Sequence, residues 1–304
     1  MKPTPMPDPS SSLRIAVLGA GRIGSAFAFQ LARAGGHDVT VIARPGSVRL
    51  AQLEKDQAIV DVASERASVR VASRLDEETP YDLLIVTLLA HQTEPLLPAL
   101  RRSASHRILF MFNTFQPEEL QAAIGSGRTA FGMPFVQATL DADGRLKATI
   151  GAGGQKTIIS EQACVELFNA AGLPAALEPN MPLWLRCHTP LCVAFESVSV
   201  AGERRGGGAT WSESLALARG IHATFAVIKS LGYQVYPQSK RRLDASPPWV
   251  VAAVLWFMSR IRPFRQLLAT GKVECAALVD VVLSAAPSET PLMLVSAIAA
   301  MKPS

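Results

Sequence analysis

Three glycines near the start of the chain have the spacing of a dinucleotide-binding turn. In IAVLGAGRIGSAF, Gly19, Gly21 and Gly24 follow an apolar run and precede an apolar pattern with helical spacing. The first glycine permits a tight turn, the second lets backbone approach a pyrophosphate, and the third lets the helix lie close to the sheet. The helix start offers free N–H groups to phosphates. We therefore expect a dinucleotide site made by Gly19, Ala20, Gly21, Arg22, Ile23 and Gly24, the alternative being a sheet turn without a ligand.

The residue after the next apolar run bears on which nicotinamide cofactor is bound. An NAD site places Asp or Glu there to accept from the ribose 2′-hydroxyl, whereas a 2′-phosphate needs a cation. Here Arg44 follows Ala43, and its planar guanidinium suits a phosphate. NADPH, or NADP in its oxidised form, is therefore the predicted cofactor. The alternative is that Arg44 is a solvated residue at a strand end.

Two further apolar runs predict buried parallel strands at residues 83–88 and 107–112, with a crossover helix at 93–102 between them. Ligands of an open α/β sheet gather at the carboxyl ends of its strands. We therefore add Leu88, Gln92 and Asn113 to the expected cofactor contacts. Asn113 is the expected partner of the nicotinamide ribose or carboxamide, or else a residue that only makes a turn.

The remaining chain changes character twice. Residues 129–159 have short alternating runs that predict antiparallel hairpins extending the sheet, and a helix is expected at 161–171. Beyond Pro182 the pattern is helical, with helices at 183–200, 212–231, 248–268 and 273–285 and irregular connections at 202–209 and 232–246. The predicted fold is α/β: a Rossmann-type doubly wound parallel sheet domain at 13–178, then an all-helical domain at 179–304 that binds substrate or dimerises.

Composition favours a soluble enzyme with two domains. The chain has 304 residues, of which 49% are hydrophobic and 18% charged. The longest uncharged apolar run, residues 249–258, is about half of the roughly 20 residues that span a bilayer, so we expect no membrane insertion and a cytoplasmic location. The proline-rich residues 1–12 predict a disordered leader. Apolar helices such as 250–258 can pack within one chain or across a homodimer.

The charge and the cysteines limit the other partners. The net charge of +5 is modest and its basic clusters lack interleaved aromatic residues, so nucleic acid is not an expected partner, whereas an anionic small-molecule substrate is. Cys187, His188 and Cys192 lie close in sequence but lack a second ligand pair, which favours buried core thiols over a metal site. No metal is predicted.

Nearly the whole chain resembles the ketopantoate reductases (2-dehydropantoate 2-reductases). The resemblance is carried by VLGAGRIG and VIAR, IVTLLAHQTEPLLPAL, LFMFN, LWLRC, LALARGIHATFAVIKSLGYQVYP, and TGKVE with PSETPLM. Members of that family reduce a 2-keto acid with NADPH between two domains, so the resemblance implies this fold and chemistry.

The departures from the family fall on its chemistry. The family has Lys at the position of Leu89, and Lys and Asn at the positions of Arg186 and Pro190. Arg262 stands where the family has a substrate-binding Ser, Thr114 replaces a Gly, and the late glutamate is kept as Glu274. Carbonyl reduction needs a proton donor or a positioned charge, and an arginine supplies only the charge at neutral pH.

The expected site residues follow from these positions. Arg186 would hold a carboxylate or the developing oxyanion, Glu274 would hold substrate or a proton-carrying water, and His188 would relay a proton. Arg262 and Asn113 are the expected substrate contacts. The alternatives are structural arginines that bridge helices and a core histidine.

Three functions are compatible with the sequence. The first is an NADPH-dependent oxidoreductase that reduces a small, acidic keto or imine substrate between the two domains. The second is a 2-dehydropantoate 2-reductase whose catalytic residues have been re-formed. The third is a non-catalytic protein that binds NADPH as a sensor or scaffold, since both lysines of the family are missing at Leu89 and Arg186.

Overall fold

The computed structural model describes residues 11–269 and 271–303. They form two compact units, the first comprising residues 11–112 and 118–181 and the second residues 113–117 and 182–303. Of the leader predicted at residues 1–12, the first ten lie outside the described residues. Ser12 belongs to the ordered first unit, because its hydroxyl donates to the carbonyl of Gly36 at 3.1 Å.

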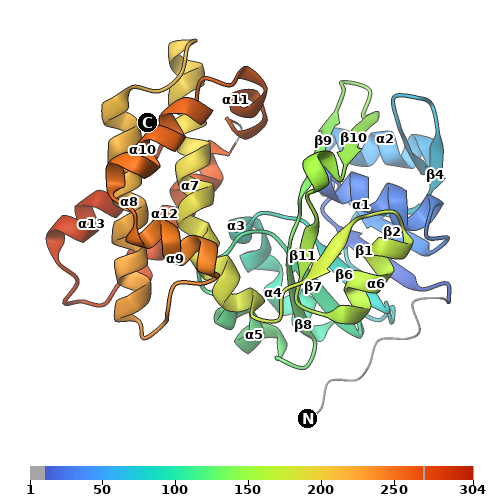
Figure 1. Cartoon of the computed structure of the whole chain (residues 1–304). Coiled ribbons are helices and arrows are strands. Elements are labelled where there is room, and N and C mark those ends of the chain that lie inside the picture. The colour runs from blue at the N-terminus through green and yellow to red at the C-terminus, as the bar shows by residue number, and fades with distance from the viewer. Residues whose placement is uncertain (1–10, 270, 304) are drawn as a thin grey trace. The chain divides into compact units, whose positions relative to one another are not determined.

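The first unit is built on an eight-stranded sheet, drawn mainly in blue and green in Figure 1. Its strand order is β12-β11-β8-β7-β6-β1-β2-β5. The strands are β1 (Arg14–Leu18), β2 (Asp38–Ile42), β5 (Arg70–Ala72), β6 (Leu83–Val86), β7 (Arg107–Met111), β8 (Thr129–Met133), β11 (Thr157–Ile159) and β12 (Ala175–Leu177). β1 pairs in parallel with β2 and β6, so three carboxyl ends lie side by side. The predicted Rossmann-type fold class is confirmed.

The segment after β8 departs in part from the predicted extension of the sheet. β11 does pair antiparallel with β8. However, β9 (Val136–Leu140) and β10 (Leu146–Ile150) form a separate two-stranded sheet. A second small sheet, formed by β3 (Ala58–Val60) and β4 (Arg66–Ser68), was not predicted, because three-residue strands carry too little alternation to be recognised.

Helices connect the strands of the first unit: α1 (Arg22–Arg33), α2 (Val48–Asp56), α3 (Ala90–Thr93), η1 (Glu94–Leu96), α4 (Leu97–Arg102), α5 (Pro117–Ile124), η2 (Ala152–Gly154) and α6 (Gln162–Ala170). The predicted crossover helix is divided into α3, η1 and α4. Pro95 and Pro98 explain the division, because proline has no N–H for the helical ladder and is tolerated only in a first turn.

The second unit is helical, as predicted. Its helices are α7 (Met181–Arg205), α8 (Trp211–Ser230), α9 (Gln238–Ala245), α10 (Pro248–Met258), α11 (Arg262–Leu268), α12 (Lys272–Ala285) and α13 (Leu292–Ala299). Their apolar faces form one core that includes Phe225, Val251 and Val279. The expectation of a single helix over 248–268 is wrong, because the chain leaves the helix after Met258 and restarts with Pro263 in the first turn of α11.

Two predicted loops are partly helical. α7 continues through Gly202 to Arg205, and α9 lies within the expected irregular connection at 232–246. A side chain at Gly202 would approach within 2.6 Å of the Arg265 side chain. Glycine in this helix therefore has a packing reason, which composition alone does not reveal.

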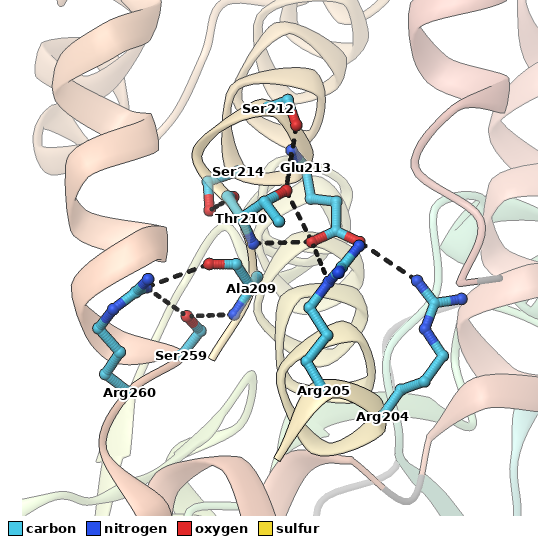
Figure 2. A network of polar contacts seen from close by, with 9 residues as sticks. All are labelled: Arg204, Arg205, Ala209, Thr210, Ser212, Glu213, Ser214, Ser259 and Arg260. Atoms are coloured by element: carbon cyan, nitrogen blue, oxygen red, sulfur yellow. Dashed lines mark hydrogen bonds and ion pairs between the residues drawn. The ribbon is translucent and has the colours of Figure 1, made fainter. Parts of the chain in front are cut away.

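The turn after α7 is fixed by a polar network, shown in Figure 2. The Thr210 hydroxyl accepts from the Glu213 N–H at 3.2 Å, and the Glu213 carboxylate accepts from the Thr210 N–H at 2.7 Å. This capping box starts α8. Arg205 and Arg204 add ion pairs to Glu213 at 3.0 and 3.2 Å. Hydrogen bonds from Arg205, together with those from Thr210, lower the pKa of Glu213 to about 2.

We expect Glu213→Gln to lower the free energy of unfolding by roughly 0.5–1.5 kcal/mol at pH 7, since the carboxylate loses charge-assisted bonds. The carboxylate has a lower pKa in the folded chain, so its contribution is complete above its ordinary value near 4.5 and is lost as pH falls towards 2. Urea unfolding at pH 7, 4 and 3 measures this. The difference between the two proteins should shrink with pH, whereas Glu54→Gln, on the exposed part of α2, should show little difference at any pH.

Candidate functional site

The glycine turn has the geometry that a dinucleotide requires. Gly19 has a φ of +111°, in the region that favours glycine. A Cβ at Gly24 would lie 1.9 Å from the carbonyl oxygen of Gly19, so only glycine lets α1 come this close to β1. At Gly21, which precedes α1, nothing lies within 4 Å of a Cβ position. The space beside the helix start is therefore open, as the pyrophosphate of a dinucleotide would need.

Arg44 lies at the carboxyl end of β2 and is exposed, while Ala43 before it is buried. Its neighbour Arg49 is differently placed: it donates to the carbonyl of Gly144 at 2.8 Å and to the Ser25 hydroxyl at 3.0 Å. Ser25 in turn donates to the carbonyl of Ala20 at 3.2 Å. Through Ser25, Arg49 thus stabilises the structure around the glycine turn. Arg44, in contrast, is exposed to solvent.

The other expected cofactor contacts in the first unit lie around the same sheet edge. Leu88 follows β6, and its side chain would be 3.0 Å from a Cβ at Gly19. Gln92 is exposed, and its side-chain oxygen accepts from the Leu89 N–H at 3.2 Å, which caps α3. Arg22 is exposed in the first turn of α1, while Ile23 packs against the core. Leu88 therefore borders the glycine turn directly, and Gln92 has a local structural bond.

Asn113 presents a buried amide with unused donors. It follows β7, is only 3% exposed, and its side-chain oxygen lies 3.2 Å from the Thr189 hydroxyl on α7. Its amide nitrogen has no hydrogen-bond partner among the described residues. A buried donor without a partner costs free energy, so it marks a place where a ligand oxygen would be stabilising.

Arg186 is held between aromatic rings. It is 4% exposed, and its guanidinium lies 4.2 Å from the ring centroid of Tyr233 and 5.7 Å from that of Phe115. Pro190 lies inside α7 and has no N–H to offer the carbonyl of Arg186. A stacked guanidinium is a fixed positive charge beside the segment that carries Asn113.

His188 is a neutral core histidine. Its ring stacks on Trp184 with centroids 4.3 Å apart. Burial, with a contribution from the charge of Lys240, lowers its pKa to about 3. At neutral pH it therefore carries no proton beyond its neutral form, which makes it a poor general acid for the relay expected from the sequence.

Glu274 has a partner that the sequence did not suggest. It lies in the first turn of α12, and burial together with the negative charge of Glu196 on α7 raises its pKa to about 7. The Glu196 carboxylate accepts from the Cys275 thiol at 3.0 Å, and a Cβ at Gly271 would lie 1.6 Å from it. The pKa of Glu196 is also raised, mainly by burial. Two carboxyl groups in one apolar setting therefore hold a proton near neutral pH.

The predicted catalytic residues form two groups along α7. Arg186 lies near the start of α7, and Asn113, which follows β7, contacts the same helix at Thr189. Glu274 meets the helix at Glu196, ten residues after Arg186, or about 15 Å along the axis at 1.5 Å per residue. Arg262 is exposed at the start of α11. The structure thus associates Asn113 with Arg186, and Glu274 with Glu196.

The cysteines are all free thiols. Within residues 11–269 and 271–303, no group of three or more His, Cys, Asp and Glu side chains is placed to hold a metal ion. Burial raises the pKa of Cys192 and Cys275, and the nearby Glu196 raises both further. These thiols therefore stay protonated and act as packing groups. No described helix is both long and apolar enough to cross a membrane.

The fold and the glycine turn define a class: a Rossmann-type sheet unit with a glycine-rich turn after its first strand, followed by a helical unit. Residues 15–162 match the family model described as ketopantoate reductase PanE/ApbA. A 2-dehydropantoate 2-reductase of Pyrococcus abyssi is 29% identical over 183 residues, which are 57% of this chain and 59% of that protein. The resemblance to the ketopantoate reductases is therefore confirmed.

Solved structures share the fold over nearly the whole chain. A PanE/ApbA family ketopantoate reductase from Ralstonia eutropha JMP134 matches with a TM-score of 0.68 at 18% identity, covering 95% of this chain and 98% of that one. D-mandelate dehydrogenase in a ternary structure with NADH and anilino(oxo)acetate matches with a TM-score of 0.65 at 13% identity, covering 95% and 98%. In sequence, the chain spans less than two thirds of the length of the curated relatives it matches.

A pair of substitutions separates folding from cofactor binding in the glycine turn. Gly24→Ala should lower the free energy of unfolding by about 1–3 kcal/mol or more, because the new methyl group meets the Gly19 carbonyl. Gly21→Ala has open space and an ordinary φ of −72°, so its stability should change by less than about 0.5 kcal/mol. It should nevertheless weaken dinucleotide binding, measured by titration calorimetry with NAD⁺ and with NADP⁺. Equal stability of both variants would contradict the close approach described above.

Glu274 should make stability depend on pH. Its carboxyl keeps a proton up to pH about 7 in the folded chain but loses it near 4.5 when unfolded. The contribution to stability is therefore present below pH 4.5 and is lost as pH rises towards 7. Urea unfolding should show Glu274→Gln gaining stability relative to the unmodified protein between pH 5 and 8. Glu289→Gln, an exposed control, should show no such gain, and parallel curves for Glu274→Gln would refute the raised pKa.

Proposed function

We propose that this protein is an NADPH-dependent oxidoreductase that reduces a small, acidic keto or imine substrate. The observation that carries the proposal is the glycine turn, open at Gly21 and bordered at the next strand by the exposed Arg44. The fold shared with D-mandelate dehydrogenase, whose structure contains NADH, supports a nicotinamide cofactor. The expected cytoplasmic location and homodimer stay predictions.

Arg44 supports the phosphorylated form of the cofactor. It occupies the position after β2 where a ribose 2′-hydroxyl would need an acidic residue, and Ala43 beside it is buried and apolar. A guanidinium can donate two parallel hydrogen bonds to a phosphate. Ser47 caps α2 by accepting from the Leu50 N–H at 3.1 Å, which leaves its hydroxyl proton available to the same phosphate.

The chemistry assigned to the helical unit is proton supply and charge stabilisation. The cofactor would supply a hydride to the carbonyl or imine carbon, and the oxygen or nitrogen then needs a proton. Glu274 would hold this proton at neutral pH, with Glu196 as the charge that keeps it bound. Arg186 and the free donors of Asn113 would bind the substrate's carboxylate or the developing negative charge. Because Glu274 meets α7 about 15 Å along the axis from Arg186, its proton would reach that charge through water.

Ketopantoate itself is a second candidate substrate, because the curated relative from Pyrococcus abyssi is a 2-dehydropantoate 2-reductase. The replacement of lysine by Leu89 and Arg186 argues for a different substrate. A panel of ketopantoate, other 2-keto acids and cyclic imines, each tested for oxidation of NADPH, distinguishes the two. Turnover of any member supports a reductase, and turnover of ketopantoate above all others selects the second candidate. Tight NADPH binding without any turnover would favour a sensor.

The cofactor preference is tested by Arg44→Ala. We expect this change to raise the Kd for NADP⁺ by roughly 10–100-fold, the value of a lost charge-assisted bond to phosphate, while the Kd for NAD⁺ changes less than about threefold. Titration calorimetry gives both constants. Arg14→Ala is the matched control, since this exposed arginine begins β1 at the opposite end of the strand from the glycine turn. Equal effects on both cofactors would contradict a 2′-phosphate contact.

A further inference from the structure

The helical unit contains a pocket whose lining includes none of Arg186, Asn113 and Glu274, the residues assigned to the proposed reduction. Side chains of α7, α8, α9 and α10 enclose about 390 Å³. Most of its wall is apolar and is formed by aromatic and branched side chains, among them Trp184, Leu191, Phe195, Val251 and Val254. Small-molecule sites in proteins have this size and this kind of lining, with a few polar groups that fix orientation.

The polar side of the pocket is formed by Lys240, His188 and Ser239. Lys240 is only 6% exposed, and its ammonium donates to the carbonyl of Trp184 at 2.9 Å and lies 3.8 Å from the centroid of the Trp184 ring. Burying an ammonium in apolar surroundings is costly unless its charge is stabilised. A tryptophan face and a carbonyl stabilise it through their negative potential.

The sign of the charge in the pocket is therefore positive. Among the described lining residues, Lys240 is the one with a basic amine, and His188 is kept neutral. No Asp or Glu lines the pocket, and Asp244 on the same helix is ion-paired with Lys229 at 3.1 Å. Further along α7, Glu196 and Glu274 act on Cys192, and Lys240 acts on the same thiol in the opposite direction. The pocket end of α7 is thus cationic and the Glu196 end is acidic.

We propose that this pocket binds an amphiphilic monocarboxylate, whose aromatic or aliphatic body fills the space between α7 and α10 and whose carboxylate meets the Lys240 ammonium. An anion placed there gains a charge-assisted hydrogen bond in a region of low dielectric constant. The apolar body gains free energy from the surface that it removes from water. Binding in this pocket does not depend on the proposed reduction.

The test is titration calorimetry of the whole protein with 3-phenylpropanoate, without added cofactor. We expect saturable binding at one site per chain, and binding at least tenfold weaker for the neutral 3-phenylpropanamide. Lys240→Gln should abolish the preference for the acid. Arg241→Gln removes the same charge from the exposed neighbouring position on α9 and should bind like the unmodified protein.

A second variant keeps the proposal testable if Lys240→Gln does not fold. Val254 lines the pocket but is 49% exposed, so Val254→Trp has room for its larger ring and should block the space without unfolding the core. It should weaken binding of the acid by at least tenfold. Absence of saturable binding to the unmodified protein, equal binding of acid and amide, or unchanged binding to Val254→Trp would each overturn the proposal.

A further measurement decides whether the bound carboxylate is a substrate or an accessory ligand. It uses phenylpyruvate, which has the same aromatic body as 3-phenylpropanoate and a 2-keto group. Oxidation of NADPH by phenylpyruvate, inhibited competitively by 3-phenylpropanoate and lost in Val254→Trp, would make the occupant a substrate. Binding of both acids without turnover would make it an accessory ligand. Both outcomes support the pocket, and because binding is measured without cofactor, failure of the proposed reductase would leave it standing.

Discussion

The close approach of α1 to β1 is the constraint on which the first unit depends. Gly24 has no room for a Cβ against the carbonyl of Gly19, and the Thr87 hydroxyl donates to that same carbonyl at 2.8 Å. The turn is thus tied to the end of β6, the neighbouring parallel strand. Because β2 pairs with the other side of β1, its end at Arg44 is placed at the same edge of the sheet. The helix contact and the strand pairing together therefore place the glycine turn and an exposed arginine at one edge of the sheet.

The parts of the structure that depend on local sequence could be predicted. The glycine spacing and the apolar runs at residues 83–88 and 107–112 gave the turn and the central strands, because each signal is contained in a few consecutive residues. Boundaries set by packing were missed. α7 continues through Gly202 because Arg265 packs where a side chain would be, and this contact joins residues 63 positions apart.

The candidate site shows the same division. Asn113 was named because it follows an apolar strand run, and Glu274 because the family resemblance keeps a glutamate there. Glu196 and Lys240 were not named, although each contributes to the pKa shift of a neighbour. A sequence signal for them exists in hindsight only as spacing: His188, Cys192 and Glu196 recur every four residues on one face of α7. Which end of this face meets α9 and which meets α12 is decided by the packing of the helical unit.

Arg186, His188 and Glu274 differ in their capacity to supply a proton. Arginine keeps its proton at neutral pH, and a histidine with a pKa of about 3 has already lost the proton it would donate, so neither Arg186 nor His188 suits proton supply. A carboxyl whose pKa is about 7 is half protonated at the working pH, where general acids are most effective. Under the proposed function, the charge and the proton that one lysine can provide together would be divided between Arg186 and Glu274. With such a division, the residue at position 186 needs only to place a positive charge and need not have a pKa near neutral pH. The pKa of the proton donor, Glu274, is set separately by burial and by Glu196.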